Sequence, residues 1–179
     1  MGHRIHLFGA SGSGTTTLGA VLAAAIDGAH LDTDNYYWHQ TDPPFTTKRL
    51  ISERIVLIEH DIATASNWVL TGSLCSWGDP LLDHFSLAVF LQLDPETRIR
   101  RLLARERRRH GERIAPGGDM YEQHEAFIAW ARSYDTAREP IRSLDMHERW
   151  ITSLPCPVMR LSSLHSPEQL TEQIMARLA

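Results

Sequence analysis

Short apolar runs alternate along the chain with longer segments in which apolar residues recur every three or four positions. The first pattern is typical of buried strands and the second of helices with one apolar face. Strands are therefore predicted at residues 4–8, 29–31, 68–71, 87–93 and 158–161. Helices are predicted at residues 16–26, 48–64, from 94 to a stop near Gly111, at 120–137, in a segment that ends at 150–154, and at 167–178.

This regular alternation of strand and helix predicts an α/β fold. A β-α unit repeated about five times calls for a parallel sheet with helices on both faces. Residues 87–93 are apolar except for Gln92, as in a strand covered on both faces. At 179 residues, with no Pro/Gly/Ser-rich linker, residues 1–179 are expected to form one domain.

The composition indicates the cellular location of this domain and the state of its cysteines. No run of about 18 apolar residues occurs, and the first strand begins at Arg4, so we expect a cytoplasmic protein without a membrane span or cleavable signal. Cys75 and Cys156 match no metal-ligand spacing and are expected to be reduced packing residues.

The net charge of −4 argues against a broad nucleic-acid surface. We therefore expect neither nucleic acid nor membrane as a partner, and a monomer or homodimer. Lys48 is the only lysine, and arginines are concentrated between Arg98 and Arg113. This local cluster needs its own explanation.

A glycine-rich loop between the first strand and the first helix predicts phosphate binding. Its backbone N–H groups can turn toward an anion, which also meets the positive end of the helix. The spacing follows GxxxxGK[ST], except that Thr15 replaces the lysine that would reach the β/γ-phosphates. The nucleotide-binding candidates are Gly9, Ser11, Gly12, Ser13, Gly14, Thr15 and Thr16.

A dinucleotide-binding loop of the form GxGxxG is an alternative interpretation. It fits less well, because Thr17 stands at the third glycine position. Asp32 does lie at a distance suited to a ribose-binding acid.

A second candidate site follows the second strand. Asp32 and Asp34 precede Tyr36, Tyr37 and Trp38, at the strand end where open α/β sheets bind ligands. An Asx-rich turn with aromatic residues on the core is the alternative.

The third strand ends in a further candidate pair of residues. Gly72 and Ser73 follow it directly, and a glycine there permits close approach of a ligand to the backbone.

The arginine-rich helix leads into glycines that can act as hinges, Gly111, Gly117 and Gly118. We expect a lid around residues 105–120. Arg105 and Arg109, four positions apart, are the candidates for charge aimed at a transferring phosphoryl group, and Arg132 is a third. A solvated helix face is the alternative for any one of them.

These features resemble the nucleoside monophosphate kinases and shikimate kinases among the P-loop kinases. The loop at residues 9–16 matches apart from Thr15, Asp32-Thr33-Asp34 resembles the Asp-x-Asp of shikimate-type kinases, and residues 101–105 resemble the Arg-x-x-x-Arg that leads into the adenylate kinase lid. The resemblance implies a three-layer α/β/α P-loop NTPase fold, with a five-stranded parallel sheet and a helical lid.

The resemblance also implies ATP and Mg²⁺ as cofactors. Thr16 and Asp32 would hold Mg²⁺, and Asp34 would contact the acceptor and take part in catalysis together with Arg105 and Arg109. The acceptor-binding set would be Asp34, Tyr37, Gly72, Ser73 and Arg132.

Three functions follow from these residues. The first is an ATP-dependent, adenylate-kinase-like transfer of a phosphoryl group to a nucleoside monophosphate or a small hydroxyl acceptor. The second is nucleotide binding without transfer, which the missing lysine at Thr15 keeps open. The third is a dinucleotide-dependent oxidoreductase. The ten histidines are scattered and form no HExxH, so none is assigned a role.

Overall fold

The protein folds around one five-stranded parallel sheet. The structure is a computed structural model that describes residues 2–178. The strand order is β2-β3-β1-β4-β5, and every neighbouring pair is parallel. The strands are β1 Arg4–Gly9, β2 Ala29–Asp32, β3 Trp68–Thr71, β4 Leu87–Gln92 and β5 Val158–Ser162. The α/β class and the parallel five-stranded sheet predicted from the sequence are confirmed.

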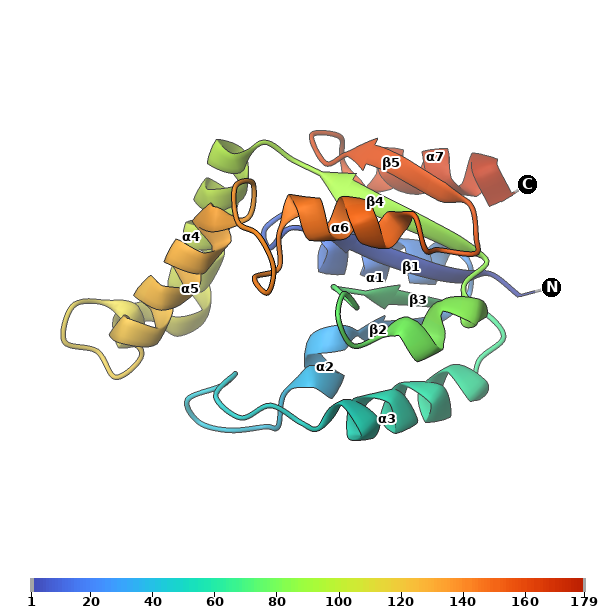
Figure 1. Cartoon of the computed structure of the whole chain (residues 1–179). Coiled ribbons are helices and arrows are strands. Elements are labelled where there is room, and N and C mark those ends of the chain that lie inside the picture. Colours follow the sequence, from blue (N-terminus) through green and yellow to red (C-terminus); the bar gives the residue numbers. More distant parts are fainter. Residues whose placement is uncertain (1, 179) are drawn as a thin grey trace.

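Helices cover both faces of this sheet, as Figure 1 shows. α1 (Thr15–Ala25) and α7 (Pro167–Leu178) pack on one face through Leu18, Leu22 and Ile174. α3 (Ile51–Ala63) and α6 (Leu144–Ile151) pack on the other, and their buried residues there are Ile58, Ile62, Met146 and Trp150. The result is the three-layer α/β/α arrangement that was expected.

A helical hairpin extends past the carboxyl ends of the strands (Figure 1). It consists of α4 (Pro95–His110), the 3₁₀ turn η2 (Gly111–Ile114) and α5 (Tyr121–Ser133). A small apolar cluster of Leu102, Ile128 and Ala131 holds the two helices together. The expected lid at residues 105–120 is the outer part of this hairpin.

Local signals explain most of the element boundaries. The Asp94 carboxylate accepts a hydrogen bond from the Thr97 N–H at 2.8 Å and caps α4, which Pro95 opens. Gly111, with φ of 54°, ends that helix.

α6 ends at Ile151, within the predicted residues 150–154. Its start, for which the sequence predicted no position, is Leu144, where the Ser143 hydroxyl caps the helix by accepting from the Met146 N–H at 3.2 Å. The short helix α2 (Thr33–Tyr37) that follows β2 was not predicted. The remaining short element is the 3₁₀ turn η1 (Asp79–His84). Among residues 2–178, no helix has both the length and the apolar character that a membrane crossing requires.

Candidate active site

The glycine-rich loop forms a tight turn at the carboxyl end of β1. Gly12 and Gly14 both have positive φ, 88° and 93°, a conformation that side chains with a Cβ rarely adopt. A Cβ on Gly12 would also lie 2.6 Å from the Arg98 carbonyl oxygen of α4. The hydroxyl of Ser163, the residue after β5, donates to the Ser13 carbonyl. The loop is therefore packed against α4 and hydrogen-bonded to the residue that follows β5.

Thr16 and Asp32 meet beside this loop. The Thr16 hydroxyl donates to the Asp32 carboxylate at 2.9 Å, and the other Asp32 oxygen accepts from the Asp34 N–H at 3.0 Å, capping α2. Hydroxyl and carboxylate oxygens are the donors that Mg²⁺ takes in proteins. This pair fits the metal-binding role predicted for it.

Asp34 lines the cavity in front of the loop. Its pKa is raised, first because surrounding protein atoms displace water and next because the Asp32 carboxylate lies nearby. Arg142 and Arg105 act in the opposite direction. A carboxylate with a raised pKa is suited to accept a proton.

The end of β3 lies close to α2. Gly72 has φ of 105°, and a Cβ there would meet the Thr33 hydroxyl oxygen at 1.8 Å, so only glycine fits. The Ser73 hydroxyl pairs with the buried His147 ring at 3.0 Å. Tyr37 lies across the same cavity, under the Arg54 guanidinium, which is centred 3.7 Å from the ring. Gly72, Ser73 and Tyr37 thus line the same cavity as Asp34.

The arginines of α4 divide into two groups. Arg98 is fully buried, with an ion pair to Asp135 and a 2.8 Å hydrogen bond to the Ala131 carbonyl. Arg101 donates to the Ser163 hydroxyl at 3.0 Å and also lines the cavity. Arg98 therefore serves the packing of the helix. Arg105 and Arg109 line the cavity, as their spacing predicted, and so does Arg108.

Arg132 is not brought to this site. It is exposed on α5 and is absent from the cavity lining. The cavity-facing residues of α5 are instead Gln123, His124, Phe127 and Trp130. The helical period of the sequence predicted the position of α5. It did not predict which face of that helix lines the cavity.

A further arginine, Arg142, lies in the wall of the cavity and was not predicted. It belongs to the segment between α5 and α6, and its Nη2 donates to the Ser11 hydroxyl of the glycine-rich loop at 2.7 Å. No motif marks it, because it stands 131 positions from its partner. The Ser143 cap next to it is the one local sign that could have drawn attention to this segment.

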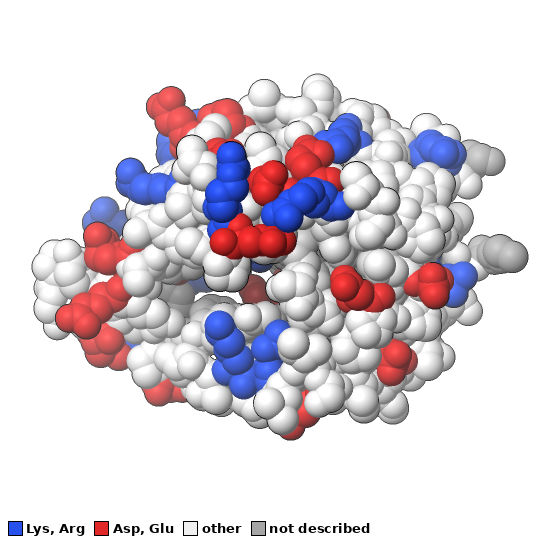
Figure 2. Space-filling model, viewed as in Figure 1, with Lys and Arg blue, Asp and Glu red and all other residues white. Residues whose placement is uncertain are grey.

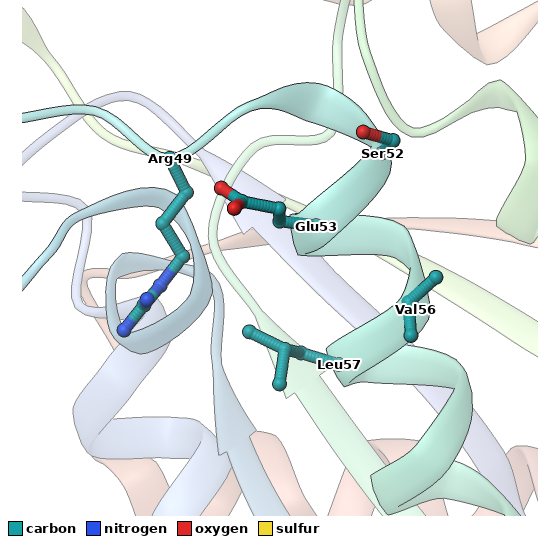
Figure 3. A pocket seen from close by; sticks show the side chains of 5 residues that line it. All are labelled: Arg49, Ser52, Glu53, Val56 and Leu57. Atoms are coloured by element: carbon teal, nitrogen blue, oxygen red, sulfur yellow. The ribbon is translucent and has the colours of Figure 1, made fainter.

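The glycine-rich loop, Asp32, Asp34, Tyr37, Ser73, Arg105, Arg109 and Arg142 line one cavity of about 1120 Å³. The face seen in Figure 2 is hollowed, and its basic and acidic side chains are interspersed. A second depression, of about 390 Å³, lies at the start of α3 (Figure 3) and is lined by Arg49, Ser52, Glu53, Val56 and Leu57. Its Glu53 carboxylate already accepts from the Leu50 N–H at 3.0 Å as a helix cap. The larger cavity is the candidate active site.

The strand order excludes the dinucleotide interpretation. Dinucleotide-binding sheets have the order 3-2-1-4-5-6, whereas β3 here lies between β2 and β1. The Asp32 carboxylate already accepts hydrogen bonds from the Thr16 hydroxyl and from the Asp34 N–H, where it caps α2.

The fold is the P-loop α/β/α fold that solved shikimate kinases also have, and the loop keeps the P-loop spacing apart from Thr15. Residues 5–129 match the family described as AAA domain, and the chain belongs to this family. A curated relative, the "Uncharacterized protein YqaC" of Bacillus subtilis (strain 168), is 42% identical over 179 residues, 100% of this chain and 99% of the relative.

Solved kinase structures share this fold. Shikimate kinase from Acinetobacter baumannii, in complex with shikimate, has a TM-score of 0.60 at 14% identity, covering 99% of this chain and 93% of that one. Shikimate kinase from Bacteroides thetaiotaomicron has a TM-score of 0.54 at 20% identity, covering 98% of both chains. A gluconokinase from Sinorhizobium meliloti 1021 has a TM-score of 0.52 at 16% identity, covering 99% and 93%.

Proposed function

We propose that the protein is a small-molecule kinase that transfers a phosphoryl group from ATP to a nucleoside monophosphate or a small hydroxyl acceptor. One observation carries this proposal. The glycine-rich loop, the Asp32–Asp34 pair and arginines of α4 line a single cavity. We place the protein in the cytoplasm as a monomer or homodimer, with these small molecules rather than nucleic acid or membranes as ligands.

Each group has a defined role in this proposal. The backbone of residues 12–16 holds the phosphates, with the positive end of α1 behind them. Thr16 and Asp32 would hold Mg²⁺, which would supply positive charge against the phosphates. Asp34 orients the acceptor hydroxyl and accepts its proton. Ser73 and Tyr37 line the acceptor end.

Arg105 and Arg109 direct positive charge into the same cavity from α4. Arg105 also pairs with Glu106 at 3.0 Å, whereas no ion pair of Arg109 is found within residues 2–178. We expect Arg109→Met to lower kcat by roughly tenfold or more, with a smaller effect on ADP binding. Arg107→Met is the matched control, because Arg107 is exposed on the same helix outside the cavity lining.

The experiment is an acceptor screen. Purified protein, ATP and Mg²⁺ are incubated with a panel of nucleoside monophosphates and small hydroxyl compounds, and ADP release and the phosphorylated product are measured. We expect one acceptor class to raise ADP release well above the rate without acceptor.

Nucleotide binding without transfer is the second candidate, favoured by Thr15 in place of lysine. ATP binding measured by calorimetry, together with no acceptor-dependent ADP release across the panel, would replace the kinase proposal with this one.

A further inference from the structure

Arg142 reaches the phosphate loop from a distant part of the chain. Its segment follows α5, so the topology, rather than the local sequence, brings its guanidinium to Ser11 at 2.7 Å. It also lies near the Asp34 carboxylate, which influences its pKa, although the two groups do not form an ion pair within 4.0 Å. Arg142 therefore lies between the phosphate loop and the acceptor end of the cavity.

The charge of Arg142 has few protein partners. No carboxylate lies within ion-pair distance of it among residues 2–178, and its Nε is buried without a hydrogen-bond partner. The Trp130 ring lies under its guanidinium, 4.6 Å from the central carbon to the ring centre. Arg142 is partly buried, and a partly buried cation with an unpaired donor gains from an anion that completes its hydrogen bonds.

Two other arginines, Arg98 and Arg54, are more deeply buried and stabilise the fold. Arg98 has Asp135 as its ion-pair partner, although its Nε also lacks a hydrogen-bond partner, and Arg54 donates to the Arg49 carbonyl through two nitrogens at 3.0 and 2.7 Å. Arg142 differs from both because it lines the cavity and its guanidinium contacts the phosphate loop.

The loop, in turn, lacks one cation. Thr15 stands where a lysine would reach the β/γ-phosphates, and the chain's only lysine is Lys48. Lys48 also lines the cavity, with its Nζ 5.8 and 5.9 Å from the ring centres of Tyr37 and Trp38. The loop itself therefore offers an anion no lysine.

We infer that Arg142 takes the place of the missing lysine and binds the terminal phosphate of ATP directly. This inference rests on the nucleotide site of the proposed function. Arginine can donate two parallel hydrogen bonds to a phosphate, and a stack on Trp130 restricts its orientation before the nucleotide arrives. Arg105 and Arg109 then act on the moving group from α4, while Arg142 holds it from the opposite segment.

The first test compares ATP with ADP. Affinities of wild type, Arg142→Met and Arg138→Met are measured by calorimetry with Mg²⁺ and without acceptor. We expect Arg142→Met to weaken ATP binding by roughly ten- to hundredfold and ADP binding much less, because only ATP presents the terminal phosphate. Arg138 is the matched control, since it is exposed in the same segment and does not line the cavity.

The second test is rescue at the loop. If Arg142 replaces the lysine, Thr15→Lys introduced into Arg142→Met should restore most of the lost ATP affinity. Circular dichroism checks that each variant is folded. Should Arg142→Met fail to fold, Arg142→Lys and Thr15→Lys/Arg142→Gln are compared with Arg142→Gln in the same assay, and we expect the two lysine-bearing proteins to bind ATP more tightly.

Two outcomes would overturn the inference. One is an unchanged ATP affinity in the folded Arg142 variant. The other is a raised KM for the acceptor alone, without rescue by Thr15→Lys, which would assign Arg142 to the acceptor. Failure of the proposed kinase function can be told apart from failure of this inference, because ATP can bind without phosphoryl transfer. Wild-type protein that binds ATP but phosphorylates nothing would overturn only the kinase proposal.

Discussion

The contact between Thr16 and Asp32 gives the most direct test of the predicted metal site. Asp32→Asn removes the charge but keeps an oxygen able to cap α2, so the helix should persist. We expect the Mg²⁺-dependent gain in ATP affinity to fall roughly tenfold, because Mg²⁺ prefers carboxylate ligands. Asp83→Asn, an exposed acid on η1, is the control. Equal Mg²⁺ dependence in both variants would remove Asp32 from the metal site.

Gly72 offers a second prediction at this scale. Alanine there places a Cβ 1.8 Å from the Thr33 hydroxyl oxygen as well as at positive φ, whereas Gly117 has similar φ, 89°, with nothing within 4 Å. We expect Gly117→Ala to lower the free energy of unfolding by about 1 kcal/mol. Gly72→Ala should cost about 3 kcal/mol or more, because α2 must move. Urea unfolding at constant m-value measures both, and equal losses would contradict the close packing of Gly72.

The individual site residues were predictable only where their chemistry is contiguous in the sequence. The loop at residues 9–16 and the Asp32–Asp34 pair each carry their spacing within a few positions. Arg142 and Ser163 contact the loop from 131 and 150 positions away in the sequence. No pattern in the residues around them indicates these contacts. Arg132 was predicted from its position in a helix, and that position does not show which face of the helix it lies on.

At the scale of elements, the α4–α5 hairpin is tied to the loop after α2. The Arg113 guanidinium pairs with Asp42 at 2.6 Å and with Asp119 at 2.7 Å, and the Gln123 amide donates to the Pro44 carbonyl at 2.8 Å. The pKa of the Asp119 carboxyl is lowered by its hydrogen bonds from Arg113. These contacts hold the outer hairpin over the cavity.

Breaking the Arg113 contact should loosen the lid without unfolding the protein. Exposed ion pairs contribute about 0–1 kcal/mol, so we expect Arg113→Ala to leave Tm nearly unchanged. Hydrogen exchange at residues 111–120 should become faster, and salt should reduce the difference from wild type.

The control for the lid variant is Arg149→Ala, since Arg149 has exposed ion pairs with Glu139 and Asp145 away from the hairpin. If both variants leave exchange at residues 111–120 at the wild-type rate, the Arg113–Asp42 contact does not restrain the lid.

The predictability of elements depended on how strongly one pattern dominated each of them. The strand at 68–71 was predicted in full, because all four of its residues are apolar or uncharged. The structure buries all four. The end of α6 was predicted, but its start was not assigned, because the signal there is a single serine cap. α2 has only 5 residues, too few for a helical period to be visible.

For the whole molecule, the alternation of strands and helices was enough to predict a parallel sheet with two covered faces. It did not predict the strand order, because a right-handed crossover can place the next strand at several positions. That order decides which strand ends meet. By placing β3 between β1 and β2, it brings Ser73 beside Asp34 and the loop into one cavity.

Two buried histidines make the stability of the whole molecule depend on pH. His6 is stacked between Phe8 and Phe85, donates from Nδ1 to the Leu70 carbonyl at 3.0 Å, and has a buried Nε2 without a partner. His147 lies between Tyr134 and Ser73. Burial lowers the pKa of each to about 3. In the folded protein both therefore stay neutral under mildly acidic conditions.

The unfolded chain takes up these protons below its ordinary histidine pKa of about 6.5, so acid favours unfolding between about pH 6.5 and 3. From pH 7 to pH 5 we expect each buried histidine to lower the free energy of unfolding by about 2 kcal/mol. His6→Phe keeps the aromatic stack and removes one of the two groups. Its loss of the Leu70 hydrogen bond lowers stability equally at both pH values, so the difference between them is the informative quantity. Urea unfolding should show a pH dependence about 2 kcal/mol smaller in His6→Phe than in wild type, and no such reduction in His60→Gln, which changes an exposed histidine. A His6→Phe protein with the full wild-type pH dependence would show that His6 takes up its proton in the folded state as readily as in the unfolded one.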